Sequence, residues 1–525
     1  MIRKTRERWN VPGSWKWANL SELGEIVSGG TPSTKEPSYW GDEINWISPA
    51  DLTGFTAKTI RQGGKSLSKI GLANSSAKVM PAGSVHFSSR APIGYVVISS
   101  QPLATNQGFK SLVPAAGIFN EYVYYYLMAS RDYARRRASG TTFLELSGRA
   151  FGDLRIPVAP KTTQYRIVAK IEELLSELDK GVESLKTARA QLEVYRQAVL
   201  KHAFEGKLTT RWREENKDKL ETAEELLARV NRERETCYEQ QLNEWDVAVK
   251  AWKVTGKKRR KPTKPRIRAA SPLPTDKDIT GFPVLPNGWL WVKVQVLLTE
   301  RPANGRSVKG RAFGFPVLRL TAIKNDKLDL MESKNGDWER KDALRYLVQK
   351  GDFLLARGNG SKRLVGRGGL VTDLERDIAY PDTMIRLRVN PSVIGEYFFS
   401  FVWNSRIVRR QIECAARTTA GIYKINQGHV TNFVLPLCSL SEQAVMVNRL
   451  SSALSAIDRI EMEVDNHLTK AHTLRQSILK KAFSGELVEQ DLSDEPASVL
   501  LERINAEQAS QKPKTKPRKR QVASA

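Results

Sequence analysis

Two stretches of the chain carry apolar residues in the spacing of a coiled coil. In residues 164–208, two seams each recur every seven positions: Ile171, Leu178, Leu185, Leu192 and Val199, and Ile167, Leu174, Gly181, Ala188 and Tyr195. Residues 443–487 repeat both seams, as Leu450, Ile457, Val464, Ala471 and Ile478, and as Met446, Ala453, Ile460, His467 and Leu474. Alternating spacings of three and four residues are typical of a coiled coil. We therefore predict two helices of roughly 60 Å each, rather than two ordinary amphipathic core helices.

The two helical stretches are copies of one sequence. They align without a gap, so that Gln197 corresponds to Gln476 and Phe204 to Phe483. The likeness continues in further pairs of segments: 15–17 and 289–291, 156–158 and 435–437, 223–231 and 497–505, and the basic stretches 257–266 and 511–520. A period this long indicates a duplicated pair of domains rather than a solenoid.

The repeat gives each half of the chain a globe, a long helix, a short helix and a basic tail. The predicted boundaries are 1–160 for the first globe, 161–208 for the first long helix, 209–280 for a short helix with a basic linker, 281–440 for the second globe, 441–487 for the second long helix and 488–525 for a short helix with a basic tail. The first long helix leads away from the first globe, and the second begins at the second globe. Shared apolar registers therefore predict antiparallel pairing with a pseudo-twofold relation, as in a symmetric dimer.

Within the globes, short apolar runs alternate with Gly and Pro, which is the pattern of strands joined by turns. The clearest runs are 84–87, 94–98, 316–323, 352–356 and 384–389, and aromatic-rich helices that end in arginines are predicted at 124–137 and 398–410. The predicted fold class is α+β: two globes of mixed α/β build separated by two long antiparallel coiled-coil helices. Outside their edges the globes share little sequence, as expected of two binding specificities on one scaffold.

Composition and charge narrow the class of protein. The 525 residues are 40% hydrophobic and 27% charged, as in a globular protein. A net charge of +27 indicates a polyanionic partner, nucleic acid first, although a solvated basic surface is the alternative. No run of 18 apolar residues and no secretory signal is present, so we expect a cytoplasmic location without membrane association. Cys237, Cys414 and Cys438 form no CxxC pair and the histidines form no HExxH, so we expect no metal site.

Several motifs resemble those of a known family. Residues 27–33 (VSGGTPS), 39–42 (YWGD) and 44–47 (INWI) resemble the opening of a target-recognition domain in the specificity (S) subunit of type I restriction–modification enzymes. The same family is matched by closing segments and by LKxAFxGxL helix ends, at 140–157, 417–436, 200–208 and 479–487. Residues 300–306 differ from the opening motif, so the resemblance does not predict the first strands of the second globe.

The resemblance implies a DNA-binding subunit with no catalytic activity of its own. Each target-recognition domain would read one half of a bipartite, asymmetric target in double-stranded DNA, and the coiled coil would fix the spacer. The implied partners are two methyltransferase (modification) subunits that methylate adenine N6 with S-adenosylmethionine, and restriction subunits that use ATP and Mg²⁺. This subunit itself would bind no cofactor and no metal.

The residues give no sign of catalysis. A DNA adenine methyltransferase needs an Asn/Asp-Pro-Pro-Tyr/Phe motif for the flipped base, and the sequence contains none. Residues 358–369 lack the strand–GxGxxG–helix context, and residues 59–66 lack the first glycine of a P-loop. The alternative function is a coiled-coil scaffold whose basic globes bind RNA or an acidic protein.

Candidate DNA contacts follow from side-chain chemistry, because Arg and Lys bind phosphates and guanine and because Asn and Gln suit adenine. In the first globe they are Arg90, Asn106, Gln107, Lys110, Arg135, Arg136, Arg137 and Arg149; in the second they are Arg357, Lys362, Arg363, Arg367, Arg417 and Lys424. For each, a solvated charge or a helix cap is the alternative. We also predict that the basic tails are disordered. The short helices at 223–231 and 497–505 share the leucine pairs 226–227 and 500–501, and we predict that each helix docks one methyltransferase subunit.

Overall fold

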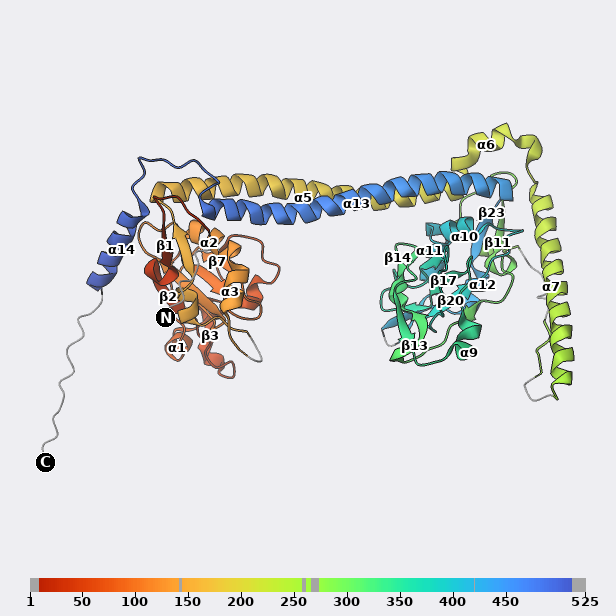
Figure 1. Cartoon of the computed structure of the whole chain (residues 1–525), viewed down its shortest axis with the longest axis horizontal. Helices are drawn as coiled ribbons and strands as arrows, with labels where there is room; N and C mark the ends of the chain where they lie inside the picture. The colour runs from red at the N-terminus through yellow and green to blue at the C-terminus, as the bar shows by residue number, and fades with distance from the viewer. Residues whose placement is uncertain (1–8, 141–143, 257–260, 266–272, 420, 512–525) are drawn as a thin grey trace, which may run out of the picture. The chain divides into compact units, whose positions relative to one another are not determined.

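The computed structural model describes residues 9–140, 144–256, 261–265, 273–419 and 421–511. The chain divides into two compact units: unit 1 is Met1–Lys186 with Asp465–Ala525, and unit 2 is Thr187–Val464. Each unit contains one globe and one half of each long helix, α5 (Lys161–Phe204) and α13 (Leu440–Ser484) (Figure 1). The two long helices and the mixed globes confirm the predicted fold class.

Globe one is built on a five-stranded sheet of order β2-β9-β6-β7-β4, with a three-stranded sheet of order β5-β3-β8 and the pair β1-β10. The strands are β1 (Lys16–Asn19), β2 (Gly24–Ser28), β3 (Trp40–Ile47), β4 (Thr59–Ile60), β5 (Lys65–Leu67), β6 (Val85–Ser88), β7 (Val96–Ser99), β8 (Ala104–Thr105), β9 (Phe109–Pro114) and β10 (Arg155–Val158). The helices of unit 1 besides α5 and α13 are α1 (Lys69–Ala73), α2 (Asn120–Ala129), α3 (Arg131–Arg137), α4 (Gly148–Gly152) and α14 (Ala497–Gln511). Buried aromatic residues, among them Phe87, Tyr122 and Phe151, form the core between sheet and helices.

Globe two has a four-stranded sheet of order β12-β20-β17-β19, a three-stranded sheet of order β18-β22-β21, and the pairs β13-β16, β14-β15 and β11-β23. The strands are β11 (Leu290–Lys293), β12 (Ala303–Asn304), β13 (Gly310–Leu318), β14 (Ile323–Lys324), β15 (Lys327–Leu328), β16 (Ser333–Gly336), β17 (Phe353–Ala356), β18 (Gly358–Asn359), β19 (Gly368–Leu370), β20 (Met384–Leu387), β21 (Arg417–Thr419), β22 (Ile422–Lys424) and β23 (Val434–Leu437). The shorter helices of unit 2 are α6 (Thr210–Glu215), α7 (Ala223–Val254), α8 (Asp276–Ile279), α9 (Arg340–Ala343), α10 (Glu396–Trp403), α11 (Arg406–Ala415) and α12 (Gln427–Asn432).

The repeated Trp-x-Trp and Pro-containing segments pair with each other inside each globe. In globe one, β1 and β10 are antiparallel with Trp17 opposite Pro157. In globe two, β11 and β23 are antiparallel with Trp291 opposite Pro436. A proline is tolerated in such two-stranded pairs because its missing N–H can face away from the partner strand. These pairs stand directly before the long helices and fix where each helix leaves its globe.

The opening strands of globe two form although its opening motif differs. β3 pairs with β5 and also in parallel with β8, where Trp46 lies opposite Ala104. β13 pairs in the same way with β16 and forms a parallel bridge between Val317 and Ala379. Both strands contain a register shift, between Trp40 and Ile44 in one and within β13 in the other. The two globes therefore share topology where they share no motif.

Each predicted aromatic helix consists of two shorter helices. The first breaks at Ser130 into α2 and α3, and the second breaks at Asn404 and Ser405 into α10 and α11. Asn404 is only 9% exposed, and its amide exchanges hydrogen bonds with the backbone of Gly368. Such side-chain bonds to the backbone compete with helix continuation. Helix periodicity alone therefore overestimated these helices.

The helix expected at 223–231 is much longer than predicted, because α7 runs for 32 residues. Part of the following basic linker packs against it: Trp245 Nε1 donates to Pro262 O at 3.0 Å, and Lys264 Nζ lies 5.5 Å from the Trp245 ring centre. The rest of the linker and the C-terminal basic tail, 257–260 and 512–520, lie outside the described residues. The prediction of disorder is therefore wrong for 261–265.

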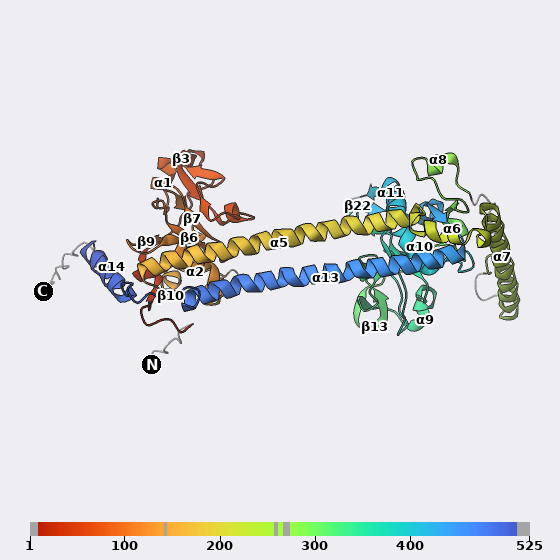
Figure 2. The same ribbon diagram turned by 90° about the horizontal axis from the view of Figure 1, so that it is seen from above.

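The long helices pair in an antiparallel manner within each unit (Figure 2). In unit 2, Arg196 of α5 binds Asp458 and Glu461 of α13 at 2.5 and 3.0 Å. In unit 1, the corresponding pair is Arg475 of α13 with Asp179 of α5. The first seam is buried or half-buried, whereas the companion seam opens to solvent; its exposed members are Gly181, His467, Tyr195 (58%), Ile460 (47%) and Leu474 (51%). Two helices alone can cover one seam but not both.

Candidate nucleic-acid interface

An exposed hairpin of globe two carries basic side chains on neighbouring strands. β21 and β22 pair so that Arg417 lies opposite Lys424, and β22 also pairs with β18, where Gly358 lies opposite Lys424 (β22 is labelled beside α11 in Figure 2). Both basic side chains are exposed, and neither has an acidic partner among the residues that the structure describes. Uncompensated cations on a narrow hairpin can bind phosphate or a guanine edge.

Three further predicted residues lie just before or just after strand β18 of the same small sheet. Arg357 immediately precedes β18 and is half-buried, and its Nη1 donates to Asp382 O at 3.4 Å. Lys362 and Arg363 are exposed in the turn that follows β18. One guanidinium nitrogen of Arg363 lies 3.5 Å from a carboxylate oxygen of Glu193 on α5. The fold therefore gathers five of the six residues predicted for globe two.

Arg367 is the sixth and serves the fold instead. Its guanidinium binds Asp326 at 2.5 Å and is 30% exposed. Asp326 and Asn325 form the turn between β14 and β15 with φ values of 61° and 48°, a left-handed turn that Asn and Asp tolerate better than most residues. Arg367 therefore fixes this turn.

In globe one, two predicted contacts converge on an acidic residue. Glu145 lies opposite Ser139 in an antiparallel bridge, and its carboxylate is 3.5 Å from Lys110 Nζ and 3.6 Å from Arg90 Nη1. Lys110 is only 6% exposed, and its Nζ also donates to Gln107 O at 3.2 Å. Burial on β9 removes Lys110 from direct contact with a large ligand, whereas Arg90 keeps about a third of its side chain exposed.

Asn106 and Gln107 form the loop between β8 and β9. The Asn106 side-chain oxygen accepts from Gly108 N at 2.8 Å, a local turn that uses the amide oxygen within the chain. Gln107 is exposed and accepts a hydrogen bond from Thr31. Gln107 is therefore the better placed of the two for a ligand.

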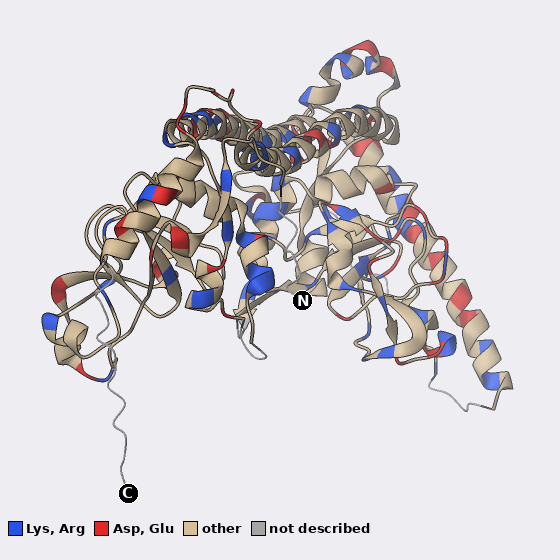
Figure 3. Ribbon diagram, turned by 60° about the vertical axis from the view of Figure 1, so that its left-hand side comes forward, with Lys and Arg blue, Asp and Glu red and all other residues tan. Residues whose placement is uncertain are grey.

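The arginines of α3 and α4 are mostly free to meet a ligand. Arg135 and Arg136 are exposed at the end of α3, while Arg137 is half-buried and lies 4.8 Å from the Tyr133 ring centre. Arg149 on α4 is 94% exposed and 3.9 Å from Asp153, so this contact is weak. Figure 3 shows acidic and basic residues interleaved along many ribbons. Whether a basic residue can contact DNA therefore depends on its neighbours in the globe rather than on the net charge of the chain.

On each short helix predicted to dock a partner, one leucine of the shared pair is buried inside the chain. Leu226 of α7 is fully buried in the core of globe two, and Leu500 of α14 is 5% exposed in the core of globe one. Ala497 N at the start of α14 donates to Ser14 O at 2.9 Å. Leu226 and Leu500 are therefore not available to a partner, because each is covered by its own globe, while docking through other faces of these two helices stays a prediction.

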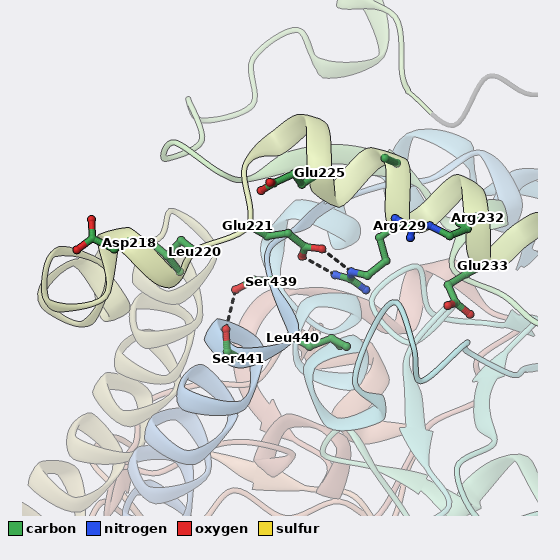
Figure 4. A pocket seen from close by; sticks show the side chains of 11 residues that line it. Asp218, Leu220, Glu221, Glu225, Arg229, Arg232, Glu233, Ser439, Leu440 and Ser441 are labelled. Carbon is green, nitrogen blue, oxygen red and sulfur yellow. Dashed lines mark hydrogen bonds and ion pairs between the residues drawn. The ribbon is translucent and has the colours of Figure 1, made fainter.

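A cleft of about 710 Å³ in unit 2 lies between α7 and the start of α13 (Figure 4). Two of its charged groups are paired: Arg229 donates to both carboxylate oxygens of Glu221 at 2.7 and 2.9 Å. Ser439 and Ser441 hydroxyls are 3.1 Å apart at the helix start. This lining contains no nucleophile activated by a neighbouring base and offers no catalytic arrangement.

Metal and membrane features are also missing from the described ranges. Among these residues, no group of three His, Cys, Asp or Glu side chains is arranged to hold a metal ion. Within the same ranges, no helix combines the length and apolar character that crossing a membrane requires.

Glu145 is not among the DNA contacts predicted from the sequence, all of which are Arg, Lys, Asn or Gln. An acidic residue carries no DNA-binding signal, although Glu145 stands two residues before Ser147 just as Lys424 stands two residues before Asn426. That positional match between the globes was visible in the sequence, but only the strand pairing shows that both residues occupy a hairpin.

Comparisons with known proteins place the chain among restriction-system subunits. Residues 12–193 match the family model described as the type I restriction modification DNA specificity domain. The specificity subunit of the Methanocaldococcus jannaschii type I restriction enzyme MjaIX is 34% identical over 37% of this chain and 44% of its own length. The Escherichia coli K12 EcoKI specificity subunit is 25% identical over 97% of this chain and 99% of its own.

A solved structure shows the same fold over most of the chain. It describes complex assembly and conformational transition of a type I restriction–modification system, and its matching chain has a TM-score of 0.61 at 16% identity, covering 91% of this chain and 100% of that one. At this identity the match establishes the fold alone. Together with the family model and the near full-length relative, it agrees with the duplicated globes and long helices. The chain is therefore similar, over nearly its whole length, to the specificity subunits of type I restriction–modification enzymes, and its residues 12–193 match their DNA specificity domain.

Proposed function

We propose that each globe reads one half of a bipartite, asymmetric sequence in double-stranded DNA, and that α5 and α13 set the spacer between the halves. One observation carries this proposal: the globes share strand pairing but place different side chains on it. The matched hairpins carry Ser139 and Glu145 in globe one, and Arg417 and Lys424 in globe two. Different hydrogen-bonding groups on one topology favour two different half-sites.

The proposed complex contains two modification subunits that use S-adenosylmethionine to methylate adenine N6, and restriction subunits that use ATP and Mg²⁺. The repeated unit supports two docking positions. The exposed apolar side chains on the long helices of unit 2 are candidates for one of them: Val194, Tyr195, Ile460 and Met462. Met462→Asp should then reduce the number of modification subunits seen by native mass spectrometry, without changing the recognised sequence.

The scaffold alternative has less support. A scaffold for RNA or for acidic proteins would not require two globes that differ on a common topology, and the matching family model is that of a DNA specificity domain. A scaffold would also not alter the methylation pattern of a genome.

The experiment that tests the proposed function is genome-wide mapping of N6-methyladenine in the host, with and without this gene. The expected result is a split, asymmetric motif that disappears on deletion and returns on complementation. Methyltransferase expression is measured in both strains as the control. An unchanged pattern with the methyltransferase present would overturn the proposal.

A further inference from the structure

After the arginine-bearing helix, each globe has an antiparallel residue pair, Ser139 with Glu145 and Arg417 with Lys424, and the residue that follows the second member makes the same kind of backbone hydrogen bond in both globes. In globe one the pair follows α3, and the residue after Glu145, Leu146, donates its N–H to Ser89 O at 3.0 Å. In globe two the pair follows α11, and the residue after Lys424, Ile425, donates its N–H to the Arg357 carbonyl at 3.0 Å. Each anchor residue, Ser89 or Arg357, lies just beyond a central strand, β6 or β17.

The next residue caps a short helix in both cases. The Ser147 side chain accepts from Ala150 N at 3.1 Å at the start of α4, and the Asn426 side chain accepts from His429 N at 2.8 Å at the start of α12. These are equivalent helix N-caps. The antiparallel pair, the backbone hydrogen bond and the N-cap correspond in the two globes. Glu145 and Lys424 therefore occupy equivalent positions and carry opposite charges.

The surroundings of Glu145 compensate its charge without saturating its oxygens. Lys110 Nζ and Arg90 Nη1 lie 3.5 and 3.6 Å away, at or beyond the outer limit of a hydrogen bond. The Glu145 side chain remains 39% exposed. A bare carboxylate would be repelled by DNA phosphates, and two adjacent cations remove that obstacle. Its lone pairs stay available to a donor.

We infer that Glu145 and Lys424 are specificity-determining residues that read base edges of opposite polarity: Glu145 accepts from the N4 amino group of a cytosine, and Lys424 donates to O6 and N7 of a guanine. This inference rests on the proposed DNA-reading function. Cytosine suits a carboxylate because its major-groove edge offers the amino donor alone, whereas adenine places the acceptor N7 beside its amino group. Guanine suits an ammonium because it presents two acceptors.

The test uses the full complex and maps methylated motifs for single-residue variants. Glu145→Gln should relax one cytosine position in one half-site, with roughly 10- to 100-fold loss of discrimination, and should leave the other half-site unchanged. Lys424→Gln should relax one guanine position in the other half-site only. Glu145→Lys should shift the preference at its position toward guanine.

The matched control is Glu43→Gln. Glu43 is on the same globe, its side chain is 42% exposed, and it also lies 3.5 Å from a lysine, Lys69. Its motif should equal that of the wild type. Melting temperatures show whether Glu145→Gln is folded, and Gln keeps an acceptor beside Lys110 to limit the loss of stability.

The outcomes separate this inference from the proposed function. A wild-type complex with no bipartite motif would refute the function itself. A bipartite wild-type motif that stays unchanged in folded Glu145→Gln and Lys424→Gln would overturn the inference alone. Relaxation at adenine rather than cytosine would also overturn the assignment for Glu145.

Discussion

Lys110 shows at the residue scale why a basic side chain in a DNA-reading globe need not touch DNA. It lies on β9 with 6% of its surface exposed and satisfies its ammonium with Gln107 O and Glu145. Burying an unpaired ammonium is costly, so a buried lysine needs such partners. Arg135 and Arg136, by contrast, are exposed on α3. Exposure and pairing, rather than residue type, separate ligand contacts from structural charges.

Replacing Arg135, Arg136 and Arg137 together by Gln should weaken DNA binding and reduce its salt dependence. Each phosphate contact that is lost lowers the slope of log affinity against log salt by about 0.9. Fluorescence anisotropy at several salt concentrations measures this slope. An unchanged slope would remove these arginines from the interface, and Arg211→Gln on α6, at an exposed ion pair, serves as the control.

His86 should make the stability of globe one depend on pH. Full burial lowers the pKa of His86 to about 3, from 6.5 when exposed. Between these two pKa values, His86 binds a proton in the unfolded chain but not in the folded one. The free energy of unfolding is therefore highest above pH 6.5 and decreases as the pH drops, by up to about 1.4 kcal/mol per pH unit. His86 Nδ1 lies 2.9 Å from Ser111 Oγ, and Asn at this position keeps a polar group there without titrating.

Thermal unfolding of the wild type and of His86→Asn between pH 7.5 and pH 4.5 measures the effect. The wild type should lose more stability than the variant over this range, even if the variant is less stable at pH 7.5. Equal slopes for both proteins would contradict the prediction. His202→Asn, an exposed site on α5, controls for a general histidine effect.

At the scale of elements, the start of each long helix is held by the chain that follows the other long helix. In unit 2, Glu442 on α13 accepts from Thr209 Oγ1, Arg213 Nη1 and Trp289 Nε1 at 2.6, 2.6 and 2.9 Å. In unit 1 the acidic residue lies in the segment that follows a long helix, not at the start of one. Asp494, after α13, accepts from Thr163 and Arg166 of α5 at 2.5 and 2.6 Å. Both units thus attach the start of one long helix to the segment that follows the other, but the acidic and basic partners are exchanged.

Glu442→Ala should destabilise unit 2 by about 3 kcal/mol, because it leaves Arg213 largely buried without its counter-ion. Glu442 is 1% exposed and Arg213 is 14% exposed. Denaturant unfolding followed by circular dichroism reports the change. Glu215→Ala breaks the exposed pair with Arg211 and should cost less than about 1 kcal/mol. A similar cost for both variants would mean that burial does not strengthen the Glu442 contact.

At the scale of the whole molecule, the length of the long helices should determine the spacer of the target. Inserting one heptad after Lys186 and another after Val464 keeps the apolar seam in register and lengthens each helix by about 10 Å. The gap between the half-sites should grow by about 3 base pairs, since ten base pairs span about 34 Å. Methylated-motif mapping reads the gap directly.

A heptad inserted in only one helix is the matched control, because it shifts α5 against α13. Arg196 would then lose Asp458, or Arg475 would lose Asp179, and assembly should fail. An unchanged gap in the double insertion would show that the helices do not set the spacer.

The sequence by itself determined the two long helices, their shared registers and the duplicated order of domains. Heptad seams and helix-end motifs are local signals, so a single chain reveals them. It also named most of the basic residues around the β18-β22-β21 sheet, because Arg417 and Lys424 stand out as charges in short, turn-rich segments. The helix breaks at Ser130 and Asn404 were not predicted, and the break at Asn404 accompanies hydrogen bonds to the distant backbone of Gly368.

Only the tertiary structure decided which charges are free and which positions of the two globes correspond. Arg367 and Lys110 look like any other cation in sequence, but Asp326 and Glu145 reach them from remote segments. The equivalence of Glu145 and Lys424 likewise emerges from strand pairing and backbone hydrogen bonds. Pairing between strands is non-local, and a sequence pattern cannot specify which distant partner a strand meets; that is set by packing of the whole globe.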